Sequence, residues 1–305
     1  MTAYLVRRLF HSIFVLTGLI VVVFVVTHQI GDPAQLMLPV EASQEQYLAL
    51  RAKLGLDDPL HERFGRFFVG VLQADFGEST SRNVPALPLV LERLPPTLYL
   101  TAVAMALALP IALLLGIISA LKPHSIADRL VTTLSVAAAC VAEFWMALML
   151  IFLLAVSLGL FRTSGYGGLE FAVLPALALA GRPIGRISQV VRTSMLDEMG
   201  KGYVTTARSK GLSERIVVTR HALKNAAIPV ITLAGDEAAN LLQGAVVVEA
   251  IFAWPGVGSL LMHAISRRDL PLLEATAMVI AGMVIVMNLL VDLTYAYLNP
   301  RVRLQ

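Results

Sequence analysis

Five charged side chains lie within long apolar stretches of the sequence: Glu143, Arg182, Arg186, Asp236 and Glu237. A charge at the centre of a lone membrane helix costs at least about 2.5–3.5 kcal/mol, so such residues usually face a bundle interior or a water-filled cavity. No nucleophile or general base accompanies them in the sequence. The chemistry they offer is therefore ion pairing or recognition of a charged solute, rather than bond cleavage.

Two arrangements of these charges remain open. Arg182 and Arg186 are four residues apart, which places them on one helix face. Both can turn toward Asp236 or Glu237. In one arrangement Arg182 and Asp236 line a translocation path and contact a charged or zwitterionic solute, with Glu143 and Glu237 as further candidates. In the other, Arg186 extends to the membrane surface and Glu237 packs against a partner subunit.

The sequence lacks the short motifs of ATP sites and hydrolases. It contains no Gly-x4-Gly-Lys-Ser/Thr phosphate loop, no Gly-x-Ser-x-Gly elbow and no His-Glu-x-x-His pair. Its six histidines are scattered, and its single cysteine, Cys140, lies in an apolar stretch where a packing role is expected. We therefore expect a non-catalytic chain that binds no cofactor and no metal.

The most polar and basic segment between apolar stretches runs from Tyr203 to Val230. Gly211 can end a helix by taking a positive φ, and Ser213 can cap a second helix through its side-chain oxygen. That second helix is expected to end near Asn225, because Pro229 does not fit a helix interior. The first helix is favoured by good helix formers, namely Ala207, Arg208 and Lys210. The segment either binds a soluble partner or is a solvated loop with none.

A third informative stretch is Glu249–Gly258, which contains two large aromatic residues and a turn-forming end. Phe252 and Trp254 suit the membrane interface, where aromatic rings can be half wet. Pro255, Gly256 and Gly258 predict a turn back toward the membrane. Glu249, Phe252 and Trp254 are candidates for a gate; a re-entrant loop without solute contact is the alternative.

The composition indicates that the elements which position these residues are membrane helices. The chain has 305 residues, of which 57% are hydrophobic and 15% charged, and its mean hydropathy is +0.75. Soluble domains are about 45–50% apolar and about 25% charged. The first apolar stretch is long for a signal peptide and no cleavage pattern follows it. Six stretches reach the ~20 residues of a membrane span: Leu9–Ile30, Leu98–Leu121, Leu134–Leu158, Phe171–Val191, Pro229–Ala250 and Ala275–Leu298.

These spans predict three parts: a first span in residues 1–30, an extracytoplasmic loop in 31–97 closed by Pro95-Pro96, and a core of five spans in 98–305. The core includes a cytoplasmic loop, 193–228. Lys and Arg near span ends favour cytoplasmic termini; those on the inner side include Arg7, Arg8, Lys122, Arg129, Arg192, Lys201, Lys224, Arg301 and Arg303. The net charge of +3 reflects this distribution rather than nucleic-acid binding.

The segment Ala207 to Gly211, followed by Ala226-Ala227-Ile228-Pro229, resembles the coupling motif of ABC importer permeases. The surrounding residues resemble the peptide and nickel importer branch in particular. Thr205 and Thr206 depart from the Glu-Ala that opens the family's motif. The resemblance implies a helix that docks into a groove of a cytoplasmic ATPase, and it assigns the coupling contacts to Thr205, Thr206, Ala207, Arg208, Lys210, Gly211 and Leu212.

Further strings resemble the same branch, so the resemblance covers nearly the whole chain; they include Gly31-Asp32-Pro33-Ala34 and Trp254-Pro255-Gly256. It implies a six-span, type I ABC importer permease of the bacterial inner membrane. The implied partners are a second related permease, two ATPases that hold ATP and Mg²⁺, and an extracytoplasmic substrate-binding protein. Peptides are the first substrate class; nickel chelates, glutathione-like and other small polar solutes stay open. A passive channel or membrane scaffold is the rival interpretation.

Overall fold

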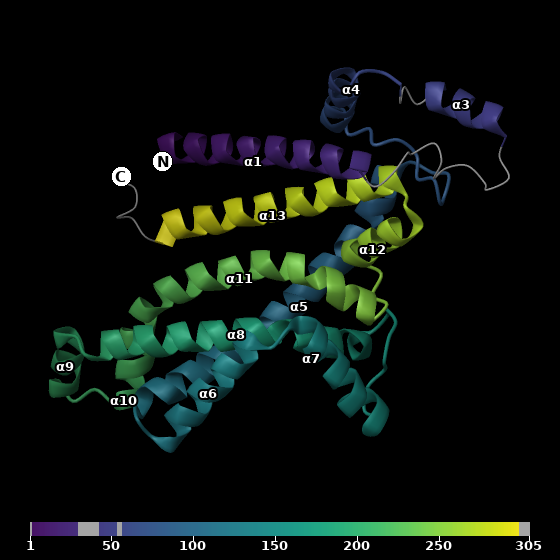
Figure 1. Cartoon of the computed structure of the whole chain (residues 1–305). Coiled ribbons are helices and arrows are strands. Elements are labelled where there is room, and N and C mark those ends of the chain that lie inside the picture. Colours follow the sequence, from purple (N-terminus) through teal and green to yellow (C-terminus); the bar gives the residue numbers. More distant parts are fainter. Residues whose placement is uncertain (1, 30–42, 54–56, 299–305) are drawn as a thin grey trace. The chain divides into compact units, whose positions relative to one another are not determined.

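The computed structural model describes residues 2–29, 43–53 and 57–298, and within them it is helical (Figure 1). The β structure in these residues is one isolated bridge between Glu78 and Pro85. This confirms the predicted all-α class. The helices are α1 (Thr2–Gln29), α3 (Gln44–Lys53), α4 (Leu60–Leu72), α5 (Ala86–Leu121), α6 (Ile126–Cys140), α7 (Glu143–Leu150), α8 (Leu169–Met199), α9 (Gly202–Ser209), α10 (Glu214–Ile216), α11 (Leu223–Ile251), α12 (Val257–Arg267) and α13 (Leu270–Leu298), with π-helices η1 (Ile151–Ser157) and η2 (Val217–Ala222).

The chain divides into two compact units, of which the first comprises residues 1–96 and 255–285. Within it, the Phe24 ring of α1 lies 5.2 Å from the Phe64 ring of α4, measured between centroids. At the junction of α12 and α13, the buried Asp269 carboxylate accepts hydrogen bonds from the hydroxyls of Ser79 and Ser81. Burial alone raises the pKa of Asp269, but these hydrogen bonds outweigh it and lower the pKa. They anchor the segment before α5 to the start of α13.

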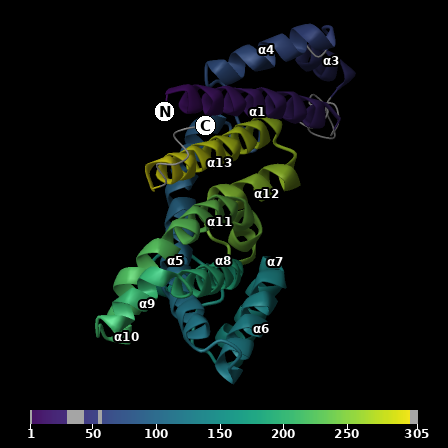
Figure 2. The same ribbon diagram turned by 90° about the vertical axis from the view of Figure 1, so that its left-hand side faces the viewer.

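The second unit comprises residues 97–254 and 286–305 and contains all of the charged candidates. Its centre is α8, which packs against α6, α7 and α11. Figures 1 and 2 both show α8 between α6 and α11. The core between these helices and α5 is apolar and includes the fully buried side chains of Leu100, Leu174, Leu179, Ile187 and Leu241. Because α8 carries Arg182 and Arg186, this packing fixes which helices their side chains can contact.

Two of the described helices are long and apolar enough to cross a membrane, Ala86–Leu121 and Leu270–Thr294. A third crossing is added if Ile126–Cys140 and Glu143–Ser157, which meet at a bend of 105°, form one broken span. Within α1, residues Ser12–Thr27 form a shorter apolar stretch of helix. The predicted span Leu134–Leu158 is thus wrong as a continuous helix: backbone at Val141 turns extended, with ψ of 130°, and ends α6.

Two predicted helix boundaries and one predicted capping bond are also wrong. Pro95-Pro96 does not close the first loop, because α5 already begins at Ala86 and runs through both prolines. The helix after Ser213 does not end near Asn225, since Pro229 lies inside α11. Ser213 has an extended backbone before α10 but makes no side-chain capping bond. A proline removes one N–H donor, whereas ending a helix leaves four carbonyls without partners. In apolar surroundings the continuous helix therefore costs less.

Candidate functional site

Four of the predicted charges meet in one cluster between α7, α8 and α11. Arg186 on α8 donates a hydrogen bond through Nη1 to Oε1 of Glu237 on α11. Arg182, one turn away, places Nε 3.6 Å from Oε2 of Glu237 and Nη1 3.9 Å from Oε1 of Glu143 at the start of α7. Glu237 is buried, with 1% of its surface exposed. The cluster holds two carboxylates and two guanidinium groups, so its formal charge is zero.

Asp236, the other predicted partner, lies elsewhere on α11. Its side chain is exposed, and within the described part of the chain it makes no ion pair. Successive residues of an α-helix point about 100° apart, so Glu237 faces α8 while Asp236 does not. In the structure Arg186 does not extend away from Glu237 but donates a hydrogen bond to it. Whether Asp236 contacts a solute stays a prediction.

A cleft of about 410 Å³ lies beside this cluster, within the second unit. Its polar lining consists of Glu143, Arg182, Asn240 and Gln243. Its remaining lining comes from the end of α6, the break before α7, the first turn of α7, and α11. Glu143 reaches the cleft by passing close to Gly244, where an added Cβ would lie 2.2 Å from Oε2 of Glu143. The glycine therefore leaves the space that the carboxylate occupies.

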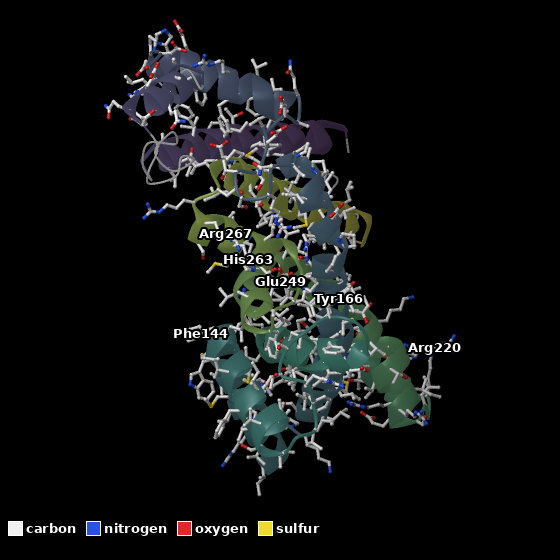
Figure 3. The ribbon with its side chains drawn as sticks, turned by 90° about the vertical axis from the view of Figure 1, so that its right-hand side faces the viewer. Phe144, Tyr166, Arg220, Glu249, His263 and Arg267 are labelled. Carbon is white, nitrogen blue, oxygen red and sulfur yellow. The ribbon has the colours of Figure 1, made fainter. Side chains whose placement is uncertain are left out.

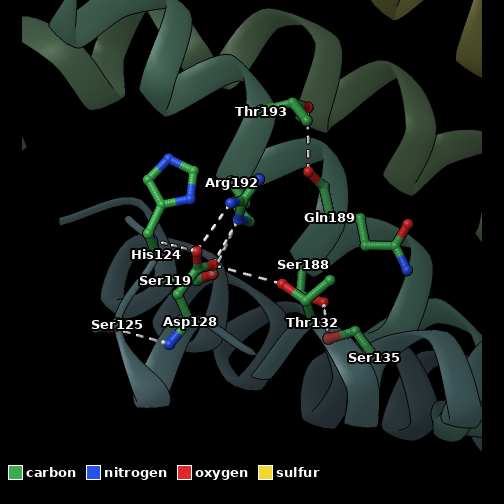
Figure 4. A network of polar contacts seen from close by, with 10 residues as sticks. All are labelled: Ser119, His124, Ser125, Asp128, Thr132, Ser135, Ser188, Gln189, Arg192 and Thr193. Atoms are coloured by element: carbon green, nitrogen blue, oxygen red, sulfur yellow. Dashed lines mark hydrogen bonds and ion pairs between the residues drawn. The ribbon is translucent and has the colours of Figure 1, made fainter. Parts of the chain in front are cut away.

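The helix that carries both arginines is held against α6 by very close backbone contact. A Cβ on Gly185 would lie 2.2 Å from the carbonyl oxygen of Ser135 and 2.9 Å from the amide nitrogen of Ala139. Beside this contact, the buried hydroxyls of Ser135 and Ser188 are 2.7 Å apart (Figure 4). Small residues at a helix crossing allow such close approach. The Gly181-x3-Gly185 spacing of the sequence thus serves α8–α6 packing through its second glycine.

One turn beyond the crossing, an ion pair joins α8 to α6 (Figure 4). Arg192 donates from Nε and Nη2 to the two carboxylate oxygens of Asp128, at 2.6 and 2.9 Å. The backbone N–H of His124 and the hydroxyl of Ser119 also donate to this buried carboxylate. A bidentate pair with its remaining lone pairs satisfied is strong and directional. It fixes the end of α8 from which α9 extends.

The helix–glycine–helix segment forms as predicted at its first turn. α9 covers Gly202–Ser209, and Gly211 follows with φ of +78°. The N–H of Gly211 donates to the carbonyl of Arg208 at 2.9 Å, and that of Leu212 to the carbonyl of Ala207 at 3.4 Å. This pair of bonds is the Schellman ending, which needs a left-handed residue where Gly211 stands.

A hydroxyl network attaches α9 to the two long helices of the unit. Tyr203 donates to Oε2 of Glu198 at the end of α8, at 2.6 Å, and accepts from Nδ2 of Asn225 on α11, at 3.1 Å. Lys201 pairs with the other Glu198 oxygen at 2.6 Å. Hydrogen bonds from Lys201 and Tyr203 lower the pKa of the Glu198 carboxyl below its ordinary value. The orientation of α9 is thus fixed by both α8 and α11.

The coupling candidates divide between two faces of this segment. Ala207 is 5% exposed and packs with Val204 and Val217 inside the segment, so it does not face outward. An exposed pair, Arg208 and Glu214, closes the bend at 2.7 Å. The exposed candidates are Thr205, Thr206, Arg208, Lys210, Gly211 and Leu212. The outward face is therefore the surface available to a partner.

The aromatic candidates are buried, which corrects the expectation of half-wet rings. Phe252 is 2% and Trp254 1% exposed. The Trp254 ring stacks on Tyr99 at 6.2 Å and meets Tyr166 edge-on at 5.0 Å, between centroids. Glu249 is also buried and accepts a hydrogen bond from the Thr97 hydroxyl at 2.6 Å; Figure 3 labels Glu249 and Tyr166. Aromatic packing inside the unit removes these rings from water, and a gate role stays a prediction.

Two family models match nearly the whole chain. The model described as "binding-protein-dependent transport system inner membrane component" matches residues 112–304, and that of its N-terminal region matches residues 1–101. The chain belongs to this family. It is therefore a multi-pass component of the bacterial inner membrane in a binding-protein-dependent transport system.

Relatives of this inner membrane component span its full length. The oligopeptide transport system permease protein AppB of Bacillus subtilis is 36% identical over 314 residues, with 99% of both chains covered. The glutathione transport system permease protein GsiC of Salmonella paratyphi A is 37% identical over 304 residues, again with 99% coverage of both.

Solved structures support the fold of the transport component. An inward-facing structure of the MetNI methionine ABC transporter superposes with a TM-score of 0.57 at 16% identity, covering 69% of this chain and 96% of that one. An amino acid ABC transporter crystallised with histidines gives 0.53 at 17% identity, with 69% and 94% covered. At these identities the likeness concerns the fold.

Several residues of this transport component were not singled out from the sequence. Asp128 and Arg192 are 64 positions apart, and nothing local marks them as partners. Asn240 and Gln243 were also missed, although the sequence holds a signal for them: both are polar, they are three residues apart, and they lie inside an apolar stretch. Tyr203 was named only as the first residue of the basic segment, although its hydroxyl joins three helices.

Proposed function

We propose that this chain is one of two related permease subunits of an ATP-driven importer for peptides. Its relatives are named for oligopeptide and glutathione transport, which supports peptides and glutathione-like solutes ahead of nickel chelates or other small polar solutes. The complex contains two ATPase subunits, which hold ATP and Mg²⁺, and an extracytoplasmic binding protein that delivers the solute. This chain supplies no catalytic group.

In the membrane we propose six spans with cytoplasmic termini, arranged as a first span (1–30), an extracytoplasmic segment (31–97) and a five-span core (98–305) with a cytoplasmic loop (193–228). The family matches, which end at 101 and begin at 112, support a division near this point. The charged residues of the cluster make α8 and α11 less apolar than a typical membrane span. Because these charges pair with one another, both helices can still cross the membrane.

The observation that carries the proposed function is that the segment from α9 to α10 is attached to both α8 and α11. It presents an exposed outer face while Tyr203, Glu198 and Asn225 tie it to α8 and α11. A displacement of α9 is therefore transmitted to the helices that carry the charged cluster. ATP binding by the partner ATPases draws two such segments together and favours the outward-facing pathway, and hydrolysis returns it. ATP drives this switch through its different affinity for the two states.

Gly211→Val should uncouple the transporter. Valine at φ of +78° is strained, because a left-handed backbone costs an ordinary L-residue about 1–2 kcal/mol and a β-branched residue more. No atom lies within 4 Å of the added Cβ, so backbone strain rather than collision is tested. In proteoliposomes with the full complex, uptake and substrate-stimulated ATPase activity should fall together severalfold while assembly persists.

The matched control is Gly211→Asn, since asparagine tolerates the left-handed region. It should retain most of the uptake that Gly211→Val loses. Wild-type uptake that is indifferent to ATP and to the ATPase subunits would favour the channel or scaffold interpretation. Equal, undiminished uptake in both variants at normal expression would refute coupling through this segment.

Reporter fusions should test the topology. Fusions after Arg129 and at Lys210 should report the cytoplasm, whereas fusions at Ala49 and Gly165 should report the outside. The reason is that the basic segments flank the inner ends of the proposed spans. A cytoplasmic signal at Ala49 would contradict the six-span arrangement.

A further inference from the structure

The cleft beside the charged cluster has hydrogen-bonding capacity that the protein itself leaves unused. Within the described residues, neither the Arg182 guanidinium nor the Glu143 carboxylate makes a side-chain hydrogen bond; their closest N–O separation is 3.9 Å. Oε2 of Glu237, on the other side of Arg182, is buried and also lacks a hydrogen-bond partner. Charges in this cluster are balanced, but Arg182 keeps its directional donors available.

Arg186 provides an internal comparison. It lies on the same face of α8 and contacts the same carboxylate, but its guanidinium is committed to a hydrogen bond with Glu237. It does not line the cleft, whereas Arg182 does. Two arginines one turn apart therefore differ in function: one satisfies the buried acid and the other faces an accessible space.

Four helices line the cleft, and three of them, α7, α8 and α11, carry its polar groups. The break between α6 and α7 brings Glu143 to its edge, and Gly244 leaves room for that carboxylate against α11. Asn240 and Gln243 add amide donors and acceptors along one wall. Their side chains make no hydrogen bond within the described part of the chain. An acid, a base and two amides match the groups of a short peptide.

We propose that this cleft is a recognition site for a zwitterionic solute with a free amino group and a free carboxylate, a small peptide in chemical class. The carboxylate binds Arg182, the ammonium group binds Glu143, and the amides of Asn240 and Gln243 contact the peptide backbone. The one cation and the one anion that line the cleft, Arg182 and Glu143, match the two charged ends of such a solute. This inference rests on the proposed importer function and specifies where in the chain its substrate is read.

The test compares uptake of radiolabelled tri-alanine, its C-terminal amide and its N-acetyl derivative by the full complex in proteoliposomes. In Arg182→Gln, the uptake ratio of free peptide to amide should fall about tenfold relative to wild type. In Glu143→Gln, the ratio of free to N-acetyl peptide should fall about tenfold. A factor of ten corresponds to about 1.4 kcal/mol, close to the lower end of the roughly 1.5–3 kcal/mol that a hydrogen bond to a charged group contributes. Discrimination by the binding protein is common to all variants and cancels.

Arg186→Gln is the matched control, because it removes the same charge from the same helix face outside the cleft. Both ratios should stay within about twofold of wild type, even where total uptake falls. Cys140, the chain's single cysteine, is exposed and lines the cleft, so it reports occupancy directly. Free tri-alanine should slow maleimide labelling of Cys140 severalfold in wild type and not in Arg182→Gln.

Unchanged ratios in both cleft variants would overturn the inference, as would the same change in Arg186→Gln. Failure of the wild-type complex to take up free tri-alanine would overturn the assigned substrate class. ATP-dependent wild-type uptake with unchanged ratios refutes only the cleft. Uptake indifferent to ATP refutes the importer function itself, so the two failures are distinguishable.

Discussion

Gly185→Ala should strongly destabilise the permease, whereas Gly181→Ala should leave it folded and stable. An added Cβ at position 185 would lie 2.2 Å from the Ser135 carbonyl oxygen and 2.9 Å from the Ala139 amide nitrogen. Both atoms belong to the backbone of α6, which cannot move aside as a flexible side chain would. Separating α8 from α6 would also break the buried contact between Ser135 and Ser188. Overpacking of this kind costs about 1–3 kcal/mol, occasionally more.

Gly181 is the internal control, because it shares the motif and the helix with Gly185. Its added Cβ would meet nothing nearer than 4.0 Å, which is ordinary contact. Alanine is the better helix former by about 0.8–1 kcal/mol, so Gly181→Ala is expected to keep the wild-type Tm or exceed it. The measurement is Tm and monodispersity of the detergent-solubilised complex. Similar Tm values for the two variants would contradict the close contact of α8 with α6.

The sequence predicted those features that depend on local backbone chemistry or on long apolar stretches. Gly211 was identified as a helix stop because few residues accept a positive φ, and the structure places it at +78°. The apolar stretches before Leu121 and after Ala275 coincide with parts of α5 and α13. These signals lie within one element and need no knowledge of its neighbours.

Features that depend on which face of a helix meets its neighbour were not predictable. Nothing in Cys140-Val141-Ala142 marks a bend, because it contains neither glycine nor proline, yet α6 ends there. Conversely, Pro229 is a strong local breaker, but α11 continues through it. Trp254 was placed at a wet interface by its residue type, whereas aromatic neighbours from two other segments bury it.

The charged cluster shows the same limit of sequence-based prediction for the choice between two adjacent residues. Sequence spacing placed Arg182 and Arg186 on one face, which the structure confirms through their shared contact with Glu237. It left open whether Asp236 or Glu237 was the partner, because the rotation of α11 about its axis is set by packing against α8 and α7. The paired cations were thus predictable, and the choice of anion was not.

Glu237→Leu should therefore be much more damaging than Asp236→Leu. Removing the buried carboxylate leaves Arg186 without its hydrogen bond and Arg182 with only the more distant Glu143. Losing a hydrogen bond to a charged group costs about 1.5–3 kcal/mol. That is less than for a fully buried pair, because the Arg186 side chain is 45% exposed. We expect a large drop in the Tm of the solubilised complex and in assembled yield. Asp236 is exposed and unpaired within the described residues, so its replacement should change stability by about 0.5 kcal/mol or less.

A double variant distinguishes charge imbalance from loss of packing. Glu237→Leu combined with Arg186→Leu removes one charge of each sign and leaves Arg182 opposite Glu143, so the cluster stays neutral. Replacing both members of a buried pair by apolar side chains is often neutral or stabilising. The double variant should recover most of the Tm lost by Glu237→Leu alone. If the two losses simply add, the residues act independently and the ion pair is not what stabilises the contact of α8 with α11. If Asp236→Leu lowers uptake at unchanged Tm, Asp236 acts on the solute rather than on the fold.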